Sequence, residues 1–560
     1  MIPSCAIRRS VMLGLLACFF QCTPDKGDIS IDHVRNAQRL IGTDFSDAEM
    51  DTLRSYLEEN KAGYDSMRRH QVHYEVAPAI YFDPRPDNFA PGVRPGKTDW
   101  KLPDNVVLPE TDAAIAMLTV AELASLVKDR KLTATRLTQI YLDRLRRYND
   151  TLQATVTITE ELALRQAATA DREISAGHYR GPLHGIPYGI KDLFSVPGYK
   201  TTWGAAPYKD QVLEQEAGVV KKLEAAGAVL VAKLVSGALA RGDVWFGGKT
   251  KNPWDLKQGA SGSSAGPGSA TAAGLVGFSI GTETLGSIIA PSTRCGITGL
   301  RPTFGRVSRS GGMSLAWSMD KVGPMCRSAQ DCALVFSVIA GKTTAETDRA
   351  VVEYPFSFDP PPDLAGYKIG YFKHLFDKDT TRNGVNNAAS LEQLKALGAT
   401  LQEVSLPDDI PYDVFDIILR AEAGAFFDEL VRTHGDRSMV EQHKGSRANS
   451  LRQSRFIPAV EYLQANRFRK MLIEKFNALS QDYDFIVSPT FGRNQSMTTN
   501  LTGHPAIAVP NGFDKAGHPT SITLIANLYD EQAILEAAYI IQQNTAHHKQ
   551  HPERFMGISK

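Results

Sequence analysis

The serines of the segment 259–303 are the residues best placed, by type and spacing, to do chemistry. The segment reads GASGSSAGPGSATAAGLVGFSIGTETLGSIIAPSTRCGITGLRPT, and Gly, Ser, Ala and Thr dominate its first half. Residues this small allow the backbone to approach another backbone or a ligand closely. A flexible linker has a similar composition, but the apolar run 275–278 argues against one. Because a free hydroxyl is a poor nucleophile, these serines need an activating base.

The base that activates a serine is usually a histidine, and a lysine is an established alternative. No histidine occurs between His184 and His374, and the others are scattered, so each would have to reach the serines through the fold. Lys191 ends the apolar run 185–190, where loss of hydration favours the neutral amine. A neutral amine can act as a general base. The residues alone also allow an ordinary surface lysine at the end of a strand.

Several ordered motifs around these residues resemble the amidase signature family. SGSSAG at 261–266, GTETLGSIIAPS at 281–292 and CGITGLRPT at 295–303 correspond to the family's GGSSGG, GTDTGGSIRxPA and CGxxGLKPT. NPWD at 252–255, GRVSRSGG at 305–312, DKVGP at 320–324 and TNLTGHPAIAVP at 499–510 also fit. The resemblance covers about residues 115–545. It implies an α/β fold whose central mixed β-sheet is covered by helices on both faces.

The resemblance implies hydrolysis of an amide bond by a serine. Lys191 corresponds to the base, Ser263 to a proton relay that follows a cis peptide bond, and Ser287 to the nucleophile. The expected reaction releases an amine or ammonia from a linear carboxylic amide through an acyl-enzyme on Ser287, with no metal or organic cofactor. The oxyanion of this reaction needs donors that are in place beforehand. The expected donors are the backbone N–H groups of Thr284, Leu285, Gly286 and Ser287.

Four positions depart from the family pattern. Leu285 replaces a glycine beside the nucleophile, and leucine tolerates fewer backbone angles. Ala265 replaces a glycine of the serine loop, which is a mild change. Ile289 replaces the usual arginine and Glu283 the usual aspartate, so a pair between these two positions would be lost. The three positions of the Ser-Ser-Lys triad are intact, and we therefore expect catalysis.

Two other motifs give weaker readings. Residues 262–266 match GxSxG, the nucleophile elbow, which would make Ser264 the nucleophile. That motif needs a strand directly before it, and the polar stretch 249–262 predicts no strand. A phosphate-binding loop at 248–250 would need its first glycine at Asp243, and we reject it.

Two alternative functions remain open. The motif wording is closest to that of the glutamyl-tRNA amidotransferase A chain, which belongs to a cytoplasmic enzyme with partner subunits. An export signal and the long extension before residue 110 contradict that role. The other alternative is an exported, inactive binding protein on an amidase scaffold, and only Leu285 and Ile289 support it.

Composition excludes several classes of function. The 560 residues include 62 Lys plus Arg and 62 Asp plus Glu, so the formal net charge is zero. A nucleic-acid-binding protein usually has a basic surplus, and we expect no nucleic-acid partner. Half of the six cysteines lie in the first 22 residues, and the others have no zinc-binding spacing. The sequence is compatible with a homo-oligomer.

The first 22 residues resemble an export signal. Arg8 and Arg9 precede an apolar run at 11–20, which is too short to span a bilayer. A cysteine that closes such a run resembles the acceptor of a bacterial lipoprotein. Cys22 is followed at once by polar residues, whereas Cys18 fits the small-residue rule better. We expect an exported protein, either periplasmic or anchored through a lipid on Cys22 or Cys18.

The rest of the chain divides into three parts. Residues 23–114 hold a tether, a helical stretch at 31–72 with a Ser46–Glu49 capping box, and a proline-rich wrapping segment at 77–110. The catalytic domain is expected at 115–545 and a tail at 546–560. Within the domain a helix is predicted at 218–226. Short apolar runs predict strands at 228–234, 276–280, 367–371, 485–487 and 522–525.

Substrate choice is less readable. The expected walls of the pocket are Trp203, the run 244–246 and the region 410–465. Their aromatic residues would suit an apolar or aryl acyl group, although ordinary core packing explains them equally well. The expected partner is therefore a small-molecule amide of unspecified structure.

Overall fold

The computed structural model describes residues 29–90, 92, 98, 100–344, 346–379, 381 and 383–557. The expected export leader, with Cys18 and Cys22, lies outside these residues. The chain forms two compact units, one ending at Val72 and one beginning at His73. None of the helices in the described ranges combines the length and apolar character needed to cross a bilayer.

The first unit is a pair of helices, α1 (Ile31–Ile41) and α2 (Asp47–Met67). The sequence predicted one helical stretch, but the chain breaks at Gly42, which has a left-handed backbone with φ of 70°. The predicted capping box is present, because the Ser46 hydroxyl accepts from the N–H of Glu49 and the Glu49 carboxylate accepts from the N–H of Ser46.

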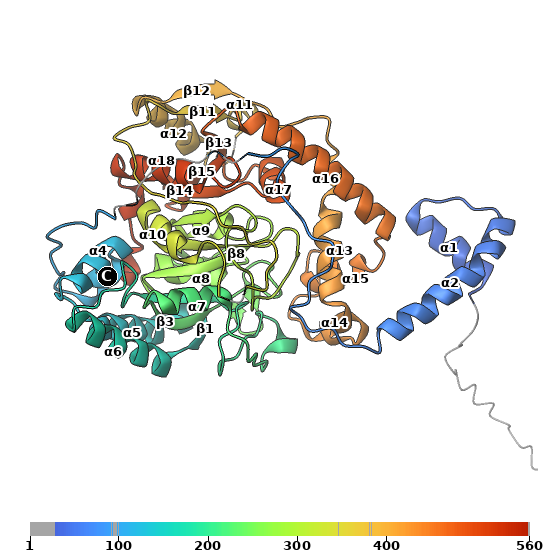
Figure 1. Cartoon of the computed structure of the whole chain (residues 1–560), viewed down its shortest axis with the longest axis horizontal. Coiled ribbons are helices and arrows are strands. Elements are labelled where there is room, and N and C mark those ends of the chain that lie inside the picture. The colour runs from blue at the N-terminus through green and yellow to red at the C-terminus, as the bar shows by residue number, and fades with distance from the viewer. Residues whose placement is uncertain are drawn as a thin grey trace, which may run out of the picture. The chain divides into compact units, whose positions relative to one another are not determined.

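The second unit is built on one mixed sheet of eleven strands, in the order β1-β3-β2-β8-β10-β9-β14-β15-β13-β11-β12. The neighbours β3, β2 and β8 are parallel, as are β13, β11 and β12, and the other pairs are antiparallel. The strands span β1 Thr155–Ile158, β2 Pro187–Lys191, β3 Val229–Leu234, β8 Phe278–Glu283, β9 Thr298–Arg301, β10 Lys321–Cys326, β11 Lys368–Tyr371, β12 Thr400–Glu403, β13 Phe485–Pro489, β14 Ala506–Phe513 and β15 Pro519–Ala526. All five predicted strands are confirmed with shifted ends. Figure 1 shows β1 and β12 at opposite ends of this sheet.

Helices cover both faces of the sheet, as predicted. Val322 of β10 points into a core that includes side chains of α4, α7, α10 and α18, whereas Met325 points into a core with α8 and α9. This alternation is the two-residue period of a strand. The bounds are α4 Val120–Lys128, α5 Ala134–Leu152, α6 Glu160–Ser175, α7 Gly218–Ala225, α8 Ala265–Ala272, α9 Ile289–Cys295, α10 Ala329–Ile339 and α18 Glu531–Gln543.

Along the chain, the remaining helices lie before β1, between β11 and β12, or between β12 and β14. Figure 1 labels most of them. They are α3 Asp112–Met117, α11 Lys373–Asp377, α12 Gly384–Ala396, α13 Asp416–Phe426, α14 Asp428–Arg432, α15 Arg447–Ser454, α16 Ala459–Ser480 and α17 Arg493–Thr502.

Two small hairpins correct one prediction. The stretch 249–262 was expected to contain no strand, but β6 (Lys251–Asn252) pairs with β7 (Asp255–Gly259), and β4 (Val244–Trp245) pairs with β5 (Gly248–Lys249). The register of the β6–β7 pair is irregular, which accommodates Pro253 in the turn. Both hairpins lie outside the central sheet, and β7 ends three residues before Gly262.

The wrapping segment predicted at 77–110 begins earlier, because residues 73–76 are also without helix or strand, and the described part of 73–110 (the wrapping segment below) contains neither. The segment packs against distant parts of its own unit through aromatic side chains. The guanidinium carbon of Arg469 lies 3.5 Å from the centroid of the Phe82 ring, a cation–π contact. The ring pairs, by centroid distance, are Tyr74 with Trp203 at 6.1 Å, Phe82 with Phe304 at 5.0 Å and Phe89 with Tyr529 at 5.8 Å.

Glu283 is a fully buried junction at the end of β8. Its Oε1 accepts hydrogen bonds from Arg301 Nη1 at 2.8 Å and from Asn500 Nδ2 at 2.9 Å. Its Oε2 accepts from the backbone N–H groups of Ile288 at 2.8 Å and Ile289 at 3.0 Å. One carboxylate therefore joins β8, β9, α17 and the start of α9. Although position 289 is an isoleucine, Glu283 still has a cationic partner, because Arg301 forms an ion pair with it.

These contacts explain the acidity of Glu283. Burial alone would raise its pKa, but the Arg301 cation and the N–H of Ile289 together lower the pKa to about 2. A carboxyl group with a folded-state pKa below that of the unfolded chain stabilises the fold above the unfolded value, which is about 4.3. That contribution is lost as the pH falls from about 4.5 to about 2.

Replacement of Glu283 by Gln is expected to lower the stability of the second unit at pH 7 by about 3 kcal/mol, because Arg301 remains buried without its partner. The difference in stability between the wild type and the variant should become smaller as the pH falls from about 4.5 to about 2. Midpoints of thermal unfolding at pH 7 and pH 3 measure both effects. Glu161→Gln, at an exposed position of α6, is the control. A Glu283→Gln protein as stable as the wild type at pH 7 would contradict the assigned role of the junction.

Candidate active site

Lys191 is the last residue of β2, and its side chain is fully buried. Parallel pairing places β2 directly beside β8, the strand that leads to Ser287. The Lys191 Nζ donates to Ser263 Oγ at 2.7 Å, to Thr282 Oγ1 at 2.8 Å and to the Thr282 carbonyl at 3.4 Å. Its partners are thus two hydroxyls and one carbonyl. The surface position for Lys191, which the residues alone allowed, is wrong.

Burial sets the protonation of this amine. Loss of hydration lowers the pKa of Lys191 to about 7, although the charges of Asp320 and Glu283 act in the opposite direction. Within the described residues Lys191 has no carboxylate within ion-pair distance. Near neutral pH a substantial fraction of Lys191 is therefore uncharged and able to accept a proton from Ser263.

Ser263 follows a cis peptide bond from Gly262, as expected from the family resemblance. Its side chain is 1% exposed, and its carbonyl accepts from the N–H of Gly237 at 3.1 Å. A Cβ at position 262 would lie 1.8 Å from the carbonyl oxygen of Gly242. Close packing of the two backbones therefore requires glycine before Ser263.

Ser264 is held as part of the frame. Its Oγ donates to the Thr282 carbonyl at 3.0 Å and accepts from the Thr282 N–H at 3.2 Å. Its side chain is fully buried, and its backbone N–H donates to the Ser287 carbonyl at 3.2 Å. The hydroxyl is committed to β8, and no strand directly precedes Gly262, so the geometry does not favour a nucleophile elbow.

Ser287 lies in the turn between β8 and α9, and its side chain is 8% exposed, more than Lys191 or Ser263. The preceding Gly286 has φ of 84°, a left-handed conformation that favours glycine. Leu285 stands where the family pattern has a second glycine. Its side chain packs on the apolar cluster that includes Ile410 and Phe415. Position 285 thus keeps a non-glycine residue in an ordinary backbone conformation.

The three predicted side chains are not all joined. Lys191 and Ser263 share a hydrogen bond, but no hydrogen bond between the hydroxyls of Ser263 and Ser287 is present among the described contacts. Catalytic hydrogen bonds are often long without a substrate and tighten in the reactive complex. The N–H groups of Ile288 and Ile289 are bound to Glu283, so these two donors are already committed.

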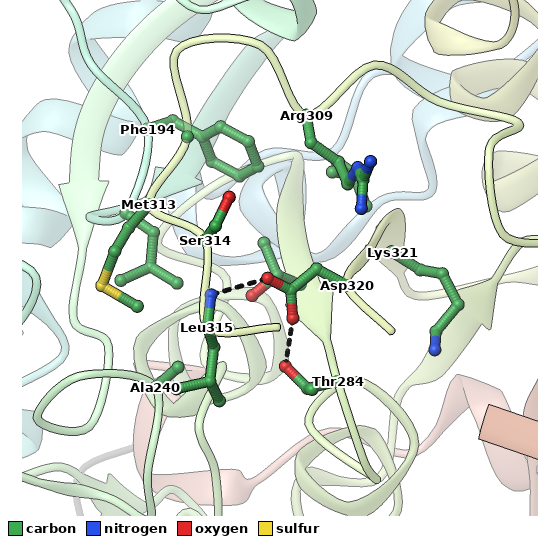
Figure 2. A pocket seen from close by; sticks show the side chains of 13 residues that line it. Phe194, Ala240, Thr284, Arg309, Met313, Ser314, Leu315, Asp320 and Lys321 are labelled. Atoms are coloured by element: carbon green, nitrogen blue, oxygen red, sulfur yellow. Dashed lines mark hydrogen bonds between the residues drawn. The ribbon is translucent and has the colours of Figure 1, made fainter. Parts of the chain in front are cut away.

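A small cavity reaches the turn between β8 and α9 at Thr284, and its lining does not include Lys191, Ser263 or Ser287 (Figure 2). Thr282 and Thr284 of the β8 end line it, together with Asp320. The remaining lining residues are Leu193, Phe194, Ala240, Arg309, Gly312, Met313, Ser314, Leu315, Lys321 and Val322. Sequence reasoning did not single out Thr282, Arg309 or Asp320, although all three lie inside motifs that match the family pattern.

The predicted pocket walls are only partly placed at this cavity. Trp203 belongs to the same apolar cluster as four lining residues, and residues 423–451 contribute to that cluster. The run 244–246 does not line the cavity. Trp245 and Phe246 instead pack edge to face on each other, with ring centroids 4.8 Å apart in the β4–β5 hairpin.

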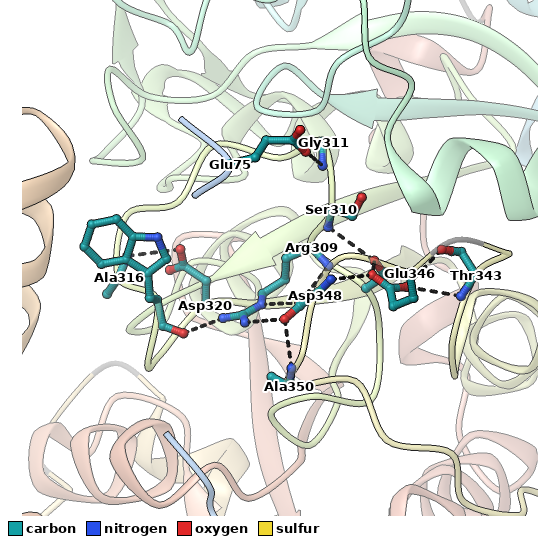
Figure 3. Close-up of polar contacts among 12 residues, drawn as sticks. Glu75, Arg309, Ser310, Gly311, Ala316, Asp320, Thr343, Glu346, Asp348 and Ala350 are labelled. Atoms are coloured by element: carbon teal, nitrogen blue, oxygen red, sulfur yellow. Dashed lines mark hydrogen bonds and ion pairs between the residues drawn. The ribbon is translucent and has the colours of Figure 1, made fainter. Parts of the chain in front are cut away.

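Three carboxylates fasten the loop that forms one wall of the cavity (Figure 3). Asp348 binds the Arg309 guanidinium at 2.7 Å through each of its oxygens. Glu75 of the wrapping segment accepts from the N–H of Gly311 at 3.0 Å. Asp320 accepts hydrogen bonds from the backbone N–H groups of Leu315 and Ala316. The described residues contain no group of His, Cys, Asp and Glu that could hold a metal ion.

Comparisons with known proteins agree with this geometry. Residues 136–498 match the family described as Amidase. The glutamyl-tRNA(Gln) amidotransferase A chain from Carboxydothermus hydrogenoformans is 34% identical over 78% of this chain and 99% of that protein, and its counterpart from Methylococcus capsulatus is 33% identical over 78% and 98%. The structure of native peptide amidase from Stenotrophomonas maltophilia is similar with a TM-score of 0.68 and 27% identity, covering 77% of this chain and 98% of that one. The chain therefore belongs to the amidase signature family.

Proposed function

We propose that this amidase-family protein hydrolyses a linear carboxylic amide, with Ser287 as nucleophile, Ser263 as proton relay and Lys191 as base. The observation that carries the proposal is the 2.7 Å hydrogen bond between Lys191 Nζ and Ser263 Oγ in a fully buried setting. A buried lysine with a pKa of about 7 is suited to take a proton near neutral pH. Ser287 is the more exposed of the two serines, which favours it over Ser263 as the group that meets the substrate.

The proposed reaction has two halves. Ser287 Oγ attacks the amide carbonyl carbon while its proton passes to Ser263, and the Ser263 proton passes to Lys191. The N–H groups of Thr284, Leu285, Gly286 and Ser287 are the proposed donors to the oxyanion. The C–N bond then breaks as the proton returns through Ser263 to the leaving nitrogen. Water attacks the acyl-enzyme in the second half, and the carboxylic acid and free Ser287 are released.

The cavity walls support an apolar acyl group. Leu193, Met313 and Leu315 present aliphatic side chains, and Trp203 packs behind them. Apolar walls with a few polar groups at one end are typical of small-molecule sites. We propose that the acyl portion of the amide is apolar or aromatic, with its carbonyl directed toward the turn 284–287.

Transfer rather than hydrolysis is the second candidate. The relatives named as amidotransferase A chains favour it, and each is covered almost completely by this chain. These relatives match 78% of this chain, so part of this chain lies outside the match. Only Leu285 and Ile289 supported the alternative of an inactive scaffold. The argument from Ile289 is weakened, because Glu283 has a cationic partner in Arg301.

Covalent labelling tests the proposed nucleophile. A fluorophosphonate probe is expected to form an adduct on Ser287, mapped by peptide mass spectrometry, because the buried base activates that hydroxyl. Ser287→Ala should remove labelling and amide turnover, and Lys191→Ala should reduce both nearly as much, since the three groups act as a unit. Thermal unfolding of each variant checks that it remains folded. An adduct on Ser264, or turnover in Ser287→Ala, would refute the assignment. Amide turnover by the purified chain alone favours hydrolysis over transfer with partner subunits.

The pH dependence tests the base. Because burial lowers the pKa of Lys191 to about 7, the neutral form is lost below that pH. The labelling rate of Ser287 is expected to rise between about pH 6 and pH 8 and then to level off. A rate that is flat over this range, or that rises toward acid, would contradict the role of Lys191. Wild-type unfolding midpoints at each pH separate titration from loss of structure.

We also propose that the protein is exported and held at a membrane by a lipid on Cys22 or Cys18. The positive residues, apolar run and closing cysteine at the start of the sequence support this proposal. Cys22→Ala is expected to move the protein from the membrane to the soluble fraction after cell fractionation. Cys18→Ala is the matched control. Release by Cys18→Ala alone would reassign the acceptor, and no release by either variant would refute lipid attachment.

A further inference from the structure

Asp320 is a buried carboxylate beside the proposed oxyanion turn. It directly precedes β10, whose first residue, Lys321, pairs across the sheet with Glu283. This register places Asp320 next to Thr284, one residue beyond Glu283 on β8. The Asp320 side chain is 9% exposed and lines the cavity of Figure 2.

Its two oxygens face different parts of the site. Oδ1 accepts from the Thr284 hydroxyl at 2.5 Å. Oδ2 accepts from the backbone N–H groups of Leu315 at 2.7 Å and Ala316 at 3.0 Å. Figure 2 shows the carboxylate between Thr284 and Leu315, and Figure 3 shows it beside Ala316. One side chain therefore fixes the turn before Ser287 and one wall of the cavity.

The charge of Asp320 is not committed to a direct ion pair. Among the described residues no cationic nitrogen lies within 4.0 Å of its carboxylate. Burial raises the pKa of Asp320 above its usual value, and the three donors at its oxygens offset this effect in part because they require acceptors. The charged groups that face Asp320 from neighbouring elements have partners of their own. Arg309 binds Asp348, Glu283 binds Arg301, and Lys191 binds Ser263. Backbone carbonyls accept from the other two cations, those of Leu239 and Ala240 from Arg447 and those of Met319 and Asn500 from Lys321.

We propose that Asp320 is a positioning residue for the acylation of Ser287, because its carboxylate fixes Thr284 in the oxyanion turn against Leu315 and Ala316 in the cavity wall. The proposal rests on the function proposed above and extends it to a residue outside the Ser-Ser-Lys triad. Donors to an oxyanion act only when they are held in place before the charge develops. Asp320 supplies that restraint from the side of the turn opposite Glu283.

A second effect follows from the charge. The negative carboxylate favours the protonated amine of Lys191 and so raises the pKa of that lysine against the larger effect of burial. Removal of the charge should lower the pKa of Lys191. Its neutral form would then be reached at a lower pH, and the rising limb of the rate would move toward acid.

The experiment measures the rate at which a fluorophosphonate labels Ser287 between pH 5 and pH 9. Asparagine keeps the size of Asp320 but has one carbonyl oxygen in place of two acceptors and carries no charge. Asp320→Asn is expected to slow labelling at least about tenfold on the plateau. The midpoint of its rising limb should lie at lower pH than that of the wild type, and a merely structural role would leave this midpoint in place.

Two further variants complete the design. Asp331 is also a fully buried carboxylate, and it accepts from the N–H of Ala121 at 3.1 Å away from the cavity, so Asp331→Asn controls for general destabilisation. Its plateau rate and midpoint should match the wild type on folded protein. Thr284→Val removes the hydroxyl that Asp320 accepts and keeps the volume. It should slow labelling without moving the midpoint, and its effect should not add fully to that of Asp320→Asn.

The outcomes separate the two proposals. Absence of labelling on wild-type Ser287 refutes the proposed function and this role together. Labelling of wild-type Ser287, with the same rate and midpoint in Asp320→Asn, refutes only the role of Asp320. If Asp320→Asn does not fold, Thr284→Val decides, because a wild-type rate in that variant overturns the proposal and a slower rate supports it.

Discussion

The burial of the Lys191 amine without a carboxylate partner is the constraint on which the rest of the site depends. An ammonium group in such a position loses its hydration, and two hydroxyls and a carbonyl compensate it only partly. The protein keeps the lysine there because β2 lies between β3 and β8, so the end of the strand is covered on both sides. Structure and chemistry share one cause, since the burial that destabilises the charged amine also makes it a base near neutral pH.

Two carboxylates then define the turn that carries Ser287. Glu283 binds the N–H groups at the start of α9, after Ser287, and Asp320 binds the Thr284 hydroxyl before Ser287. The turn is thus held from both ends by groups that lie on the ends of adjacent antiparallel strands. A peptide turn fixed in this manner can present several N–H groups to one point without rearrangement.

The sequence predicted the frame of this protein better than its site. Short apolar runs identified five strands of the sheet, because a strand that is buried on both faces appears in the sequence as a nearly continuous apolar run. The family resemblance indicated that helices cover both faces of this sheet. The sequence did not reveal that Arg301 supplies the cation for Glu283, because β8 and β9 do not pair directly and lie on either side of β10. It also missed Asp320 and Thr282, since a single polar residue in a motif carries no sign of what its side chain touches. The small hairpins were missed because their polar, irregular strands lack the alternation that predicts a sheet.

The wrapping segment has a consequence for the order in which the chain can fold. Tyr74, Glu75 and Phe82 contact residues near 203, 311 and 304, and Phe89 contacts Tyr529. These are contacts of very high sequence separation, and such contacts form late because a long loop must close first. The segment is synthesised before all of these partners, which lie far along the chain. It must therefore remain solvated during synthesis, and its proline-rich composition suits a segment that stays unpaired without aggregating.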